Sequence, residues 1–154
     1  MAAAATHPTE SFCRGGCPSG YEGAQFGLIQ GLGSISQTFT SQAGSHQLAW
    51  LDANRIGYGN DHAYQVSVDG TVVGTYTPSY TFAGGNKFHK ETLDLANLTA
   101  GSHVLAFTAT VAGDGTAFID DVKLGVTEAA AWAMMLIVVA GLGAMLRRRR
   151  LLAA

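Results

Sequence analysis

Residues 64–76 read YQVSVDGTVVGTY, and this stretch decides the fold class. Two apolar runs, QVSV and TVVG, flank the dipeptide Asp69-Gly70. Both positions of an Asp-Gly pair accept a positive φ, which is what the two-residue type I′ turn of a β-hairpin requires. The stretch therefore predicts two antiparallel strands joined by a tight turn.

The sequence on either side of this hairpin repeats the same pattern of short apolar runs between glycine-containing turns. No helical period precedes residue 126. The predicted strands cover residues 24–30, 34–40, 46–55, 63–69, 71–76, 87–95, 102–111 and 116–124. Eight short strands without helices indicate an all-β protein, most simply an eight-stranded jelly-roll β-sandwich.

Composition agrees with a small β-domain and excludes one class of partner. Charged residues make up 13% of the chain and 20 of its 154 residues are glycine, which suits a protein rich in turns. The formal net charge is −2, although Arg147–Arg150 alone supply four of the nine basic residues. The domain that precedes them is therefore acidic, so we expect no nucleic-acid partner.

The C-terminal tail has the composition of a membrane anchor. Ala129 to Leu146 form an 18-residue run without charge or proline, and a helix of that length spans about 27 Å, close to the hydrocarbon thickness of a bilayer. Arg147–Arg150 follow at once and should stay on the cytoplasmic side. Trp132 is placed for the interfacial belt. The domain then lies outside the inner membrane.

This tail resembles the PEP-CTERM sorting signal of Gram-negative bacteria. The apolar helix, the run Glu128 to Ala133 and the arginine cluster Arg147, Arg148, Arg149 and Arg150 carry the resemblance. The Pro-Glu-Pro motif itself is reduced to Glu128. The resemblance implies recognition by an exosortase and delivery to the cell surface or the exopolysaccharide matrix. A plain C-terminal membrane anchor is the alternative.

The N-terminus does not match an exported protein. Residues 1–10 read MAAAATHPTE and lack the basic start and apolar stretch of a signal peptide. We infer a truncated chain or a misplaced start; insertion by the tail alone, with the domain cytoplasmic, is the alternative. The predicted organisation is an irregular segment 1–23, the remnant of a longer domain, a β-sandwich 24–125 and a tail 126–154.

The series GLIQGLGSISQTFT, AGSHQLAWLDANR, YQVSVDGTVVGTYTP, LTAGSHVLAFTA and DGTAFIDDVKL resembles the galactose-binding-like jelly roll often found ahead of a PEP-CTERM tail. The resemblance covers roughly residues 24 to 125. It implies binding of carbohydrate or matrix without catalysis. A structural surface protein with no specific ligand is the alternative.

Aromatic and polar residues in two loops are the predicted sugar site. Tyr58, Asn60, Tyr76 and Tyr80 lie in or beside segments rich in Gly, Pro and Asn. A tyrosine ring in a loop can stack on the apolar face of a sugar. The alternative for each tyrosine is that it covers the edge of the sandwich. Trp50 alternates with Leu48 and is predicted to lie in the core.

Asp120 is the polar residue least expected at its position. It shares the period-2 phase of Phe118, Val122 and Leu124, and a carboxylate on an apolar face is costly unless paired or metal-bound. Arg55, in phase with an equally apolar face, is one predicted partner. The galactose-binding-like resemblance implies the other, a structural Ca²⁺ at Asp120, with Asp114 or Glu22 contributing oxygens. A bulge at Asp120-Asp121 that turns both side chains outward is the third possibility.

The remaining reactive residues predict a disulfide and no enzyme. Cys13 and Cys17 can form a small disulfide loop outside the cytoplasm, whereas a metal site would need two more ligands and only His7 is near. The five histidines form no HExxH motif, and no G-x-S-x-G elbow is present. We therefore predict a non-catalytic protein.

Overall fold

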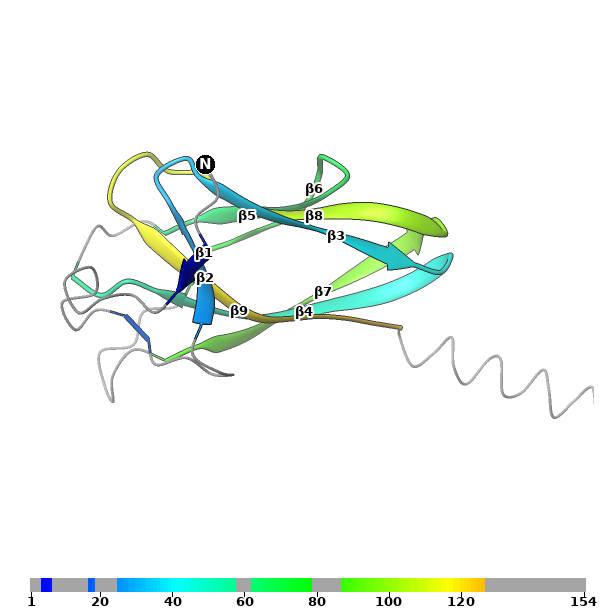
Figure 1. The fold of residues 1–154 in the computed structure, drawn as a ribbon, viewed down its shortest axis with the longest axis horizontal. Coiled ribbons are helices and arrows are strands. Elements are labelled where there is room, and N and C mark those ends of the chain that lie inside the picture. The colour runs from blue at the N-terminus through cyan, green and yellow to red at the C-terminus, as the bar shows by residue number, and fades with distance from the viewer. Residues whose placement is uncertain (1–3, 7–16, 19–24, 58–61, 79–86, 127–154) are drawn as a thin grey trace, which may run out of the picture.

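The computed structural model describes residues 4–6, 17–18, 25–57, 62–78 and 87–126 (Figure 1). Within these ranges the chain is all-β. Its nine strands are β1 (Ala4–Thr6), β2 (Gln25–Gln30), β3 (Ser34–Ser41), β4 (Gly44–Asn54), β5 (Tyr64–Val68), β6 (Thr71–Tyr76), β7 (His89–Leu98), β8 (Gly101–Ala109) and β9 (Thr116–Val126).

The strands form two antiparallel sheets that face each other (Figure 1). The five-stranded sheet has the order β1-β2-β9-β4-β7 and the four-stranded sheet has the order β3-β8-β5-β6. The predicted all-β class and two-sheet sandwich are confirmed. The predicted hairpin is also present: Val68 pairs with Thr71 across a turn in which Asp69 and Gly70 have φ of 51° and 78°.

Two strand predictions need correction. Segment 1–23 was predicted to be irregular, but it contains a ninth strand, β1, which pairs with β2 from Ala4↔Gly27 to Thr6↔Gln25. The sequence Ala-Ala-Thr has no alternation to reveal it, and hydrogen bonding to the β2 edge defines it. β7 also runs from His89 to Leu98 rather than over 87–95.

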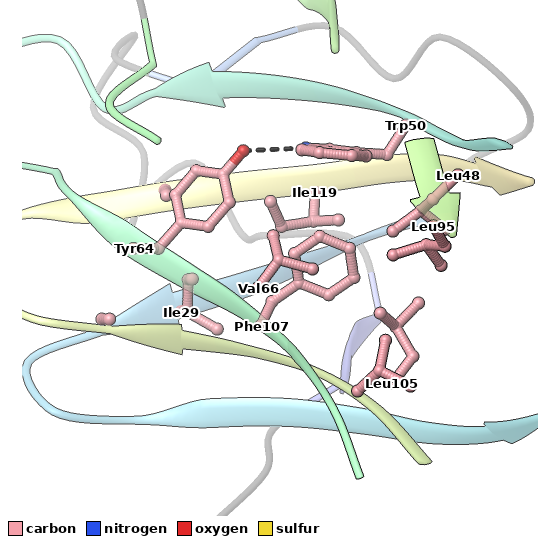
Figure 2. Packing of buried hydrophobic residues seen from close by; sticks show 12 residues of the cluster. Ile29, Leu48, Trp50, Tyr64, Val66, Leu95, Leu105, Phe107 and Ile119 are labelled. Carbon is pink, nitrogen blue, oxygen red and sulfur yellow. Dashed lines mark hydrogen bonds between the residues drawn. The ribbon is translucent and has the colours of Figure 1, made fainter. Parts of the chain in front are cut away.

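The main core lies between the two sheets and follows from period-2 alternation (Figure 2). In β5, Tyr64, Val66 and Val68 are buried while the residues between them are half-buried. Leu48 and Trp50 of β4 meet them from the other sheet, with Trp50 1% exposed. The prediction that Trp50 belongs to the core is confirmed. Burial of each such side chain contributes about 1.5–3 kcal/mol.

A second, smaller cluster covers the outer face of the five-stranded sheet. Phe26, Ala53 and Phe118 form it, and Phe88 packs against it. Phe26 meets Phe118 edge-to-face with ring centroids 5.1 Å apart. Because of this cluster, the end of β4 is buried on both faces, from Trp50 to Asn54.

β9 contains a bulge that changes which face its residues occupy. Asp120 lies opposite Leu51 and Lys123 lies opposite Ala49, so two residues of β9 face Trp50 alone. The extra residue leaves Asp121 with φ of 49°. Phe118 therefore belongs to the outer cluster, whereas Leu124 packs against the main core. The prediction that both lie on one face is wrong, because the bulge shifts the alternation between them.

Candidate functional site

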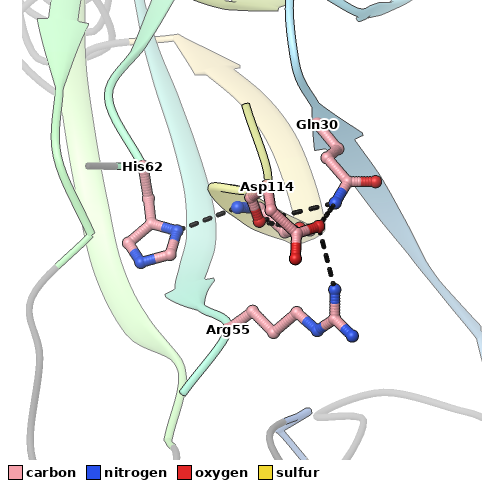
Figure 3. Close-up of polar contacts among 5 residues, drawn as sticks. Gln30, Arg55, His62 and Asp114 are labelled. Atoms are coloured by element: carbon pink, nitrogen blue, oxygen red, sulfur yellow. Dashed lines mark hydrogen bonds and ion pairs between the residues drawn. The ribbon is translucent and has the colours of Figure 1, made fainter. Parts of the chain in front are cut away.

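Polar side chains gather at one end of the sandwich, where β2 and β4 end and β9 begins (Figure 3). Asp114, in the loop before β9, accepts a hydrogen bond from Gln30 Nε2 at the end of β2. Its Oδ1 also lies 3.5 Å from Nη1 of Arg55, just after β4. The guanidinium is buried with 6% of its side-chain surface exposed, while the Asp114 side chain is 56% exposed. The ion pair thus connects a buried cation with a carboxylate at the surface.

His62 closes this end from the four-stranded sheet. It lies two residues before β5, and its Nδ1 accepts the backbone N–H of Thr116 at 2.9 Å. A ring nitrogen that accepts a hydrogen bond carries no proton, so His62 is neutral in this arrangement. His62 is 6% exposed. This hydrogen bond fixes the start of β9.

A buried chain of hydrogen bonds lies just inside this end and connects the two sheets. Trp50 Nε1 donates to the Tyr64 hydroxyl at 2.8 Å (Figure 2). That hydroxyl in turn donates to Asp52 Oδ2 at 2.7 Å. All three side chains are at most 1% exposed. The chain places a carboxylate in the core, where only paired polar groups are tolerated.

The environment of Asp52 changes its protonation. Burial raises the pKa of Asp52 to about 6, although the hydrogen bond from Tyr64 acts in the opposite direction. Burial and the nearby Asp52 carboxylate raise the pKa of the Tyr64 phenol. Asp52 Oδ1 has no hydrogen-bond partner within the part of the chain that the structure describes. Burial thus disfavours the charged form of Asp52, whose pKa lies above the ordinary range of a carboxyl.

Tyr76 is the one predicted sugar-binding residue that the structure describes. Its ring meets Trp50 edge-on at 4.8 Å and stacks on Tyr64 at 5.8 Å. Tyr76 lies on the edge strand β6, is half-buried and packs against the main core, as the alternative for each tyrosine predicts. Tyr58, Asn60 and Tyr80 lie outside the described residues. The structure therefore places one aromatic ring of the predicted site at the polar end and leaves the other three residues as predictions.

The structure does not bring Arg55 and Asp120 together. Asp120 lies opposite Leu51, four residues before Arg55 on β4, and four strand residues span about 13 Å. Asp114 takes the place predicted for Asp120 as the partner of Arg55. Asp120 instead accepts the backbone N–H of Asp121 at 2.8 Å, as part of the bulge. Local alternation could not reveal this, because the loop before β9 brings Asp114 to Arg55.

The predicted calcium ligands Asp114 and Asp120 do not lie together in the described part of the chain. Asp114 bonds to Gln30 at the end of β2, whereas Asp120 sits at the bulge further along β9. Among the described residues, no three His, Cys, Asp or Glu side chains are close enough together to hold a metal ion. Glu22, the third predicted ligand, lies outside the described residues. The calcium site therefore stays a prediction.

The remaining predicted residues lie mostly outside the described ranges. Cys17 is disulfide-bonded, and its predicted partner Cys13 is outside them. The tail residues Glu128, Trp132 and Arg147–Arg150 are outside them as well. Within the described part of the chain, no helix has the length and apolar character needed to cross a membrane.

The Asp52–Tyr64–Trp50 chain is the feature that sequence reasoning missed. Asp52 shares the phase of Leu48 and Trp50, so an acid on an apolar face was visible in the sequence, as it was for Asp120. Its partner was not visible, because Tyr64 belongs to the other sheet.

Comparison with solved structures identifies the fold. A family 35 carbohydrate-binding module from Clostridium thermocellum superposes with a TM-score of 0.55 at 21% identity, over 72% of this chain and 85% of that module. A family 35 module from Cellvibrio japonicus gives 0.56 at 21% identity, over 71% and 80%. The module CBM36, solved with calcium and xylotriose, gives 0.51 at 14% identity, over 64% and 78%.

These likenesses show a carbohydrate-binding-module fold of the jelly-roll type. Neither a protein-family model nor a curated protein matches the sequence. One similar chain, a mannanase from Podospora anserina, carries such a module fused to an enzyme, and the present chain covers 26% of it. The prediction that the present chain is not an enzyme stays a prediction.

Proposed function

We propose that the β-sandwich of residues 24–125 is a non-catalytic module that binds carbohydrate. The observation that carries the proposal is the fold: two family 35 carbohydrate-binding modules share it over 80–85% of their own length. The polar end of the sandwich supports it independently. A half-buried aromatic ring beside fixed hydrogen-bonding groups suits a sugar, whose ring faces are apolar and whose edges are hydroxylated.

Tyr76 is the proposed stacking residue, and Tyr58, Asn60 and Tyr80 are proposed to bind the sugar with it. Trp50 and Tyr64 hold the Tyr76 ring in place, so little conformational entropy would be lost when a sugar stacks on it. Because Tyr76 is already half-buried against the core, little of its surface is left for stacking. We therefore expect weak binding to a neutral or acidic glycan, roughly micromolar to millimolar.

The experiment that tests this proposal is retention on polysaccharides. The full-length chain is purified in non-ionic detergent and compared with a Tyr58→Ala/Tyr80→Ala double variant and with Tyr76→Ala. Thr75→Ala, an exposed neighbour on β6, is the matched control. Retention that falls in the tyrosine variants and not in the control supports the site. No retention of the wild-type chain on any polysaccharide would favour a structural surface protein without a specific ligand.

We further propose that the protein is exported to the envelope and processed through its tail. The apolar run 129–146 and the cluster Arg147–Arg150 support insertion into the inner membrane. The PEP-CTERM-like segment from Glu128 through Trp132 supports handling by an exosortase-type enzyme. Exopolysaccharide at the cell surface would then be the ligand of the module.

A structural calcium ion at Asp120 is the last part of the proposal. The module CBM36, which has a similar fold, was solved with calcium, and Asp120 offers a partly buried carboxylate on β9. Calcium prefers six to eight oxygen ligands, so Glu22 and backbone carbonyls would have to contribute. If the ion binds, a chelator should lower the melting temperature of the wild-type chain and leave that of Asp120→Asn unchanged. An identical chelator effect on both proteins would exclude Asp120 as a ligand.

A further inference from the structure

A hollow of about 370 Å³ lies on the outer face of the five-stranded sheet, where β7, β4 and β9 run side by side (Figure 1). Leu51 of β4 is among its lining residues. Phe88 and Lys90 line it from the β7 side, and Asp121 and Lys123 line it from β9. Its volume is within the range of small-molecule sites, roughly 300–1,000 Å³. This lysine pocket is separate from the polar end around Asp114.

The pocket concentrates the lysines of an otherwise acidic domain. The chain has three lysines, Lys87, Lys90 and Lys123. Two of them line the pocket, and the third directly precedes Phe88. The three lysines of the chain therefore lie in or next to one pocket.

The two lining lysines differ in what they can offer a ligand. Lys123 Nζ lies 2.6 Å from Asp121 Oδ1, so this pair is neutral as a unit and presents both donors and an acceptor. Lys90 is exposed, lies opposite Leu51 and makes no ion pair with any residue that the structure describes. Asp120 lies on the far side of Leu51. An anionic group would therefore bind at Lys90.

Phe88 gives the pocket a fixed apolar wall. It is half-buried, and its ring meets Phe26 edge-on with centroids 6.1 Å apart. Phe26 is held in turn by Phe118. The wall is thus in place before a ligand arrives, which lowers the entropic cost of binding.

We propose that the lysine pocket binds a sugar unit that carries a carboxylate, as in an acidic, uronate-containing polysaccharide. The sugar ring lies against Phe88, its carboxylate pairs with Lys90, and its hydroxyl groups bond to the Asp121–Lys123 pair. This inference rests on the proposed carbohydrate-binding function and names the chemical class of the ligand.

The test compares an acidic and a neutral polysaccharide. Polygalacturonate and an uncharged galactan are titrated into the full-length chain in non-ionic detergent at low ionic strength. The variants are Lys90→Met and Lys90→Arg, with Lys87→Met as a control that changes the net charge equally outside the pocket lining. All three changes are at exposed positions, and melting curves verify that each variant is folded.

We expect Lys90→Met to weaken polygalacturonate binding about tenfold, the usual loss when a charge-assisted hydrogen bond is removed. Lys90→Arg should retain binding, Lys87→Met should change it less than about twofold, and added salt should weaken it. Equal effects of Lys87→Met and Lys90→Met would overturn the pocket as the site. Binding of galactan but not polygalacturonate would overturn this inference while leaving the proposed function intact. Binding of neither would count against both.

Discussion

At the scale of single residues, Tyr64 links the two sheets through directional hydrogen bonds. Its hydroxyl is both the acceptor for Trp50 and the donor to Asp52. Apolar packing is non-directional, so it allows several arrangements of the facing sheets. A hydrogen-bonded chain with one geometry selects among them.

Replacement of Tyr64 by Phe should therefore destabilise the domain by about 2–4 kcal/mol, because it leaves a buried indole N–H and a buried carboxylate oxygen without their partner. Urea unfolding of the full-length chain measures this. Tyr76→Phe is the matched control, since the Tyr76 hydroxyl makes no hydrogen bond to any described residue, and it should cost less than about 1 kcal/mol. Equal losses in the two variants would contradict a structural role for the hydroxyl.

His103 is the second residue whose contacts have a measurable consequence. Its Nδ1 lies 2.7 Å from Asp69 Oδ2 and its Nε2 lies 3.0 Å from the Thr99 carbonyl. Both neighbours are acceptors, so both bonds form only when the imidazole is protonated. The hydrogen bond to Asp69 raises the pKa of His103 and lowers the pKa of Asp69.

This pair should make the domain less stable on the alkaline side. A raised histidine pKa gives stability that is complete below about pH 6.5 and is lost as the pH rises through the folded-state value. A lowered aspartate pKa gives stability that is complete above about pH 4 and is lost as the pH falls through its folded-state value. The pair therefore stabilises the domain most between about pH 4 and pH 6.5.

The measurement is the melting temperature from about pH 5 to pH 9, for the wild-type chain and for Asp69→Asn. Asparagine tolerates the positive φ of position 69 and can still accept the Val104 N–H, which Asp69 accepts at 2.8 Å. The decline toward alkaline pH should be shallower in the variant. Parallel curves would show that the ion pair does not contribute.

At the scale of elements, the bulge in β9 determines which of its residues face the lysine pocket and which face the core. The first half of β9 pairs with β2 and β4, and the bulge opposite Trp50 then shifts its alternation. The shift turns Asp121 toward the lysine pocket while Leu124 packs in the main core. A regular strand of the same sequence would not present these two residues in this way.

The conformation of Asp121 supplies a test of the bulge. Asp121 has φ of 49°, a region that costs residues with a Cβ about 1–2 kcal/mol and glycine almost nothing. Asp121→Ala and Asp121→Gly both remove the carboxylate that pairs with Lys123. The alanine variant should therefore be less stable than the glycine variant by about 1 kcal/mol in denaturant unfolding. An alanine variant as stable as the glycine variant would show that the backbone does not keep this conformation in solution.

At the scale of the whole molecule, the two candidate binding regions use different parts of the sandwich. The polar end around Asp114 and Tyr76 lies where strands of both sheets meet the loops, whereas the lysine pocket lies on the outer face of one sheet. A polysaccharide is long enough to contact more than one region, and two weak sites on one chain bind more tightly than either alone.

The location of the whole protein follows from the proposed tail. When it is produced behind an N-terminal export signal, the chain should fractionate with the membrane, and protease added to spheroplasts should digest the domain. A variant without residues 127–154 should instead be released with the periplasmic proteins. A domain that stays protected while a periplasmic control protein is digested would contradict export.

The sequence by itself determined the local structure of the described region. Alternation of apolar residues predicted eight of its strands, and Asp69-Gly70 predicted the hairpin, because the existence of a strand and the residues of a tight turn are largely local properties. It also predicted Trp50 in the core. β1 escaped prediction, because three residues without alternation become a strand only by pairing with β2.

Only the tertiary structure decided which side chains meet. It paired Arg55 with Asp114 rather than Asp120, joined Asp52 to Tyr64 across the sheets, and brought Lys90 and Lys123 to one pocket. Each of these contacts joins residues on different strands or loops. Their meeting depends on strand order, on the bulge in β9 and on the stacking of the sheets. These are set by the packing of the whole domain, and local alternation does not record them.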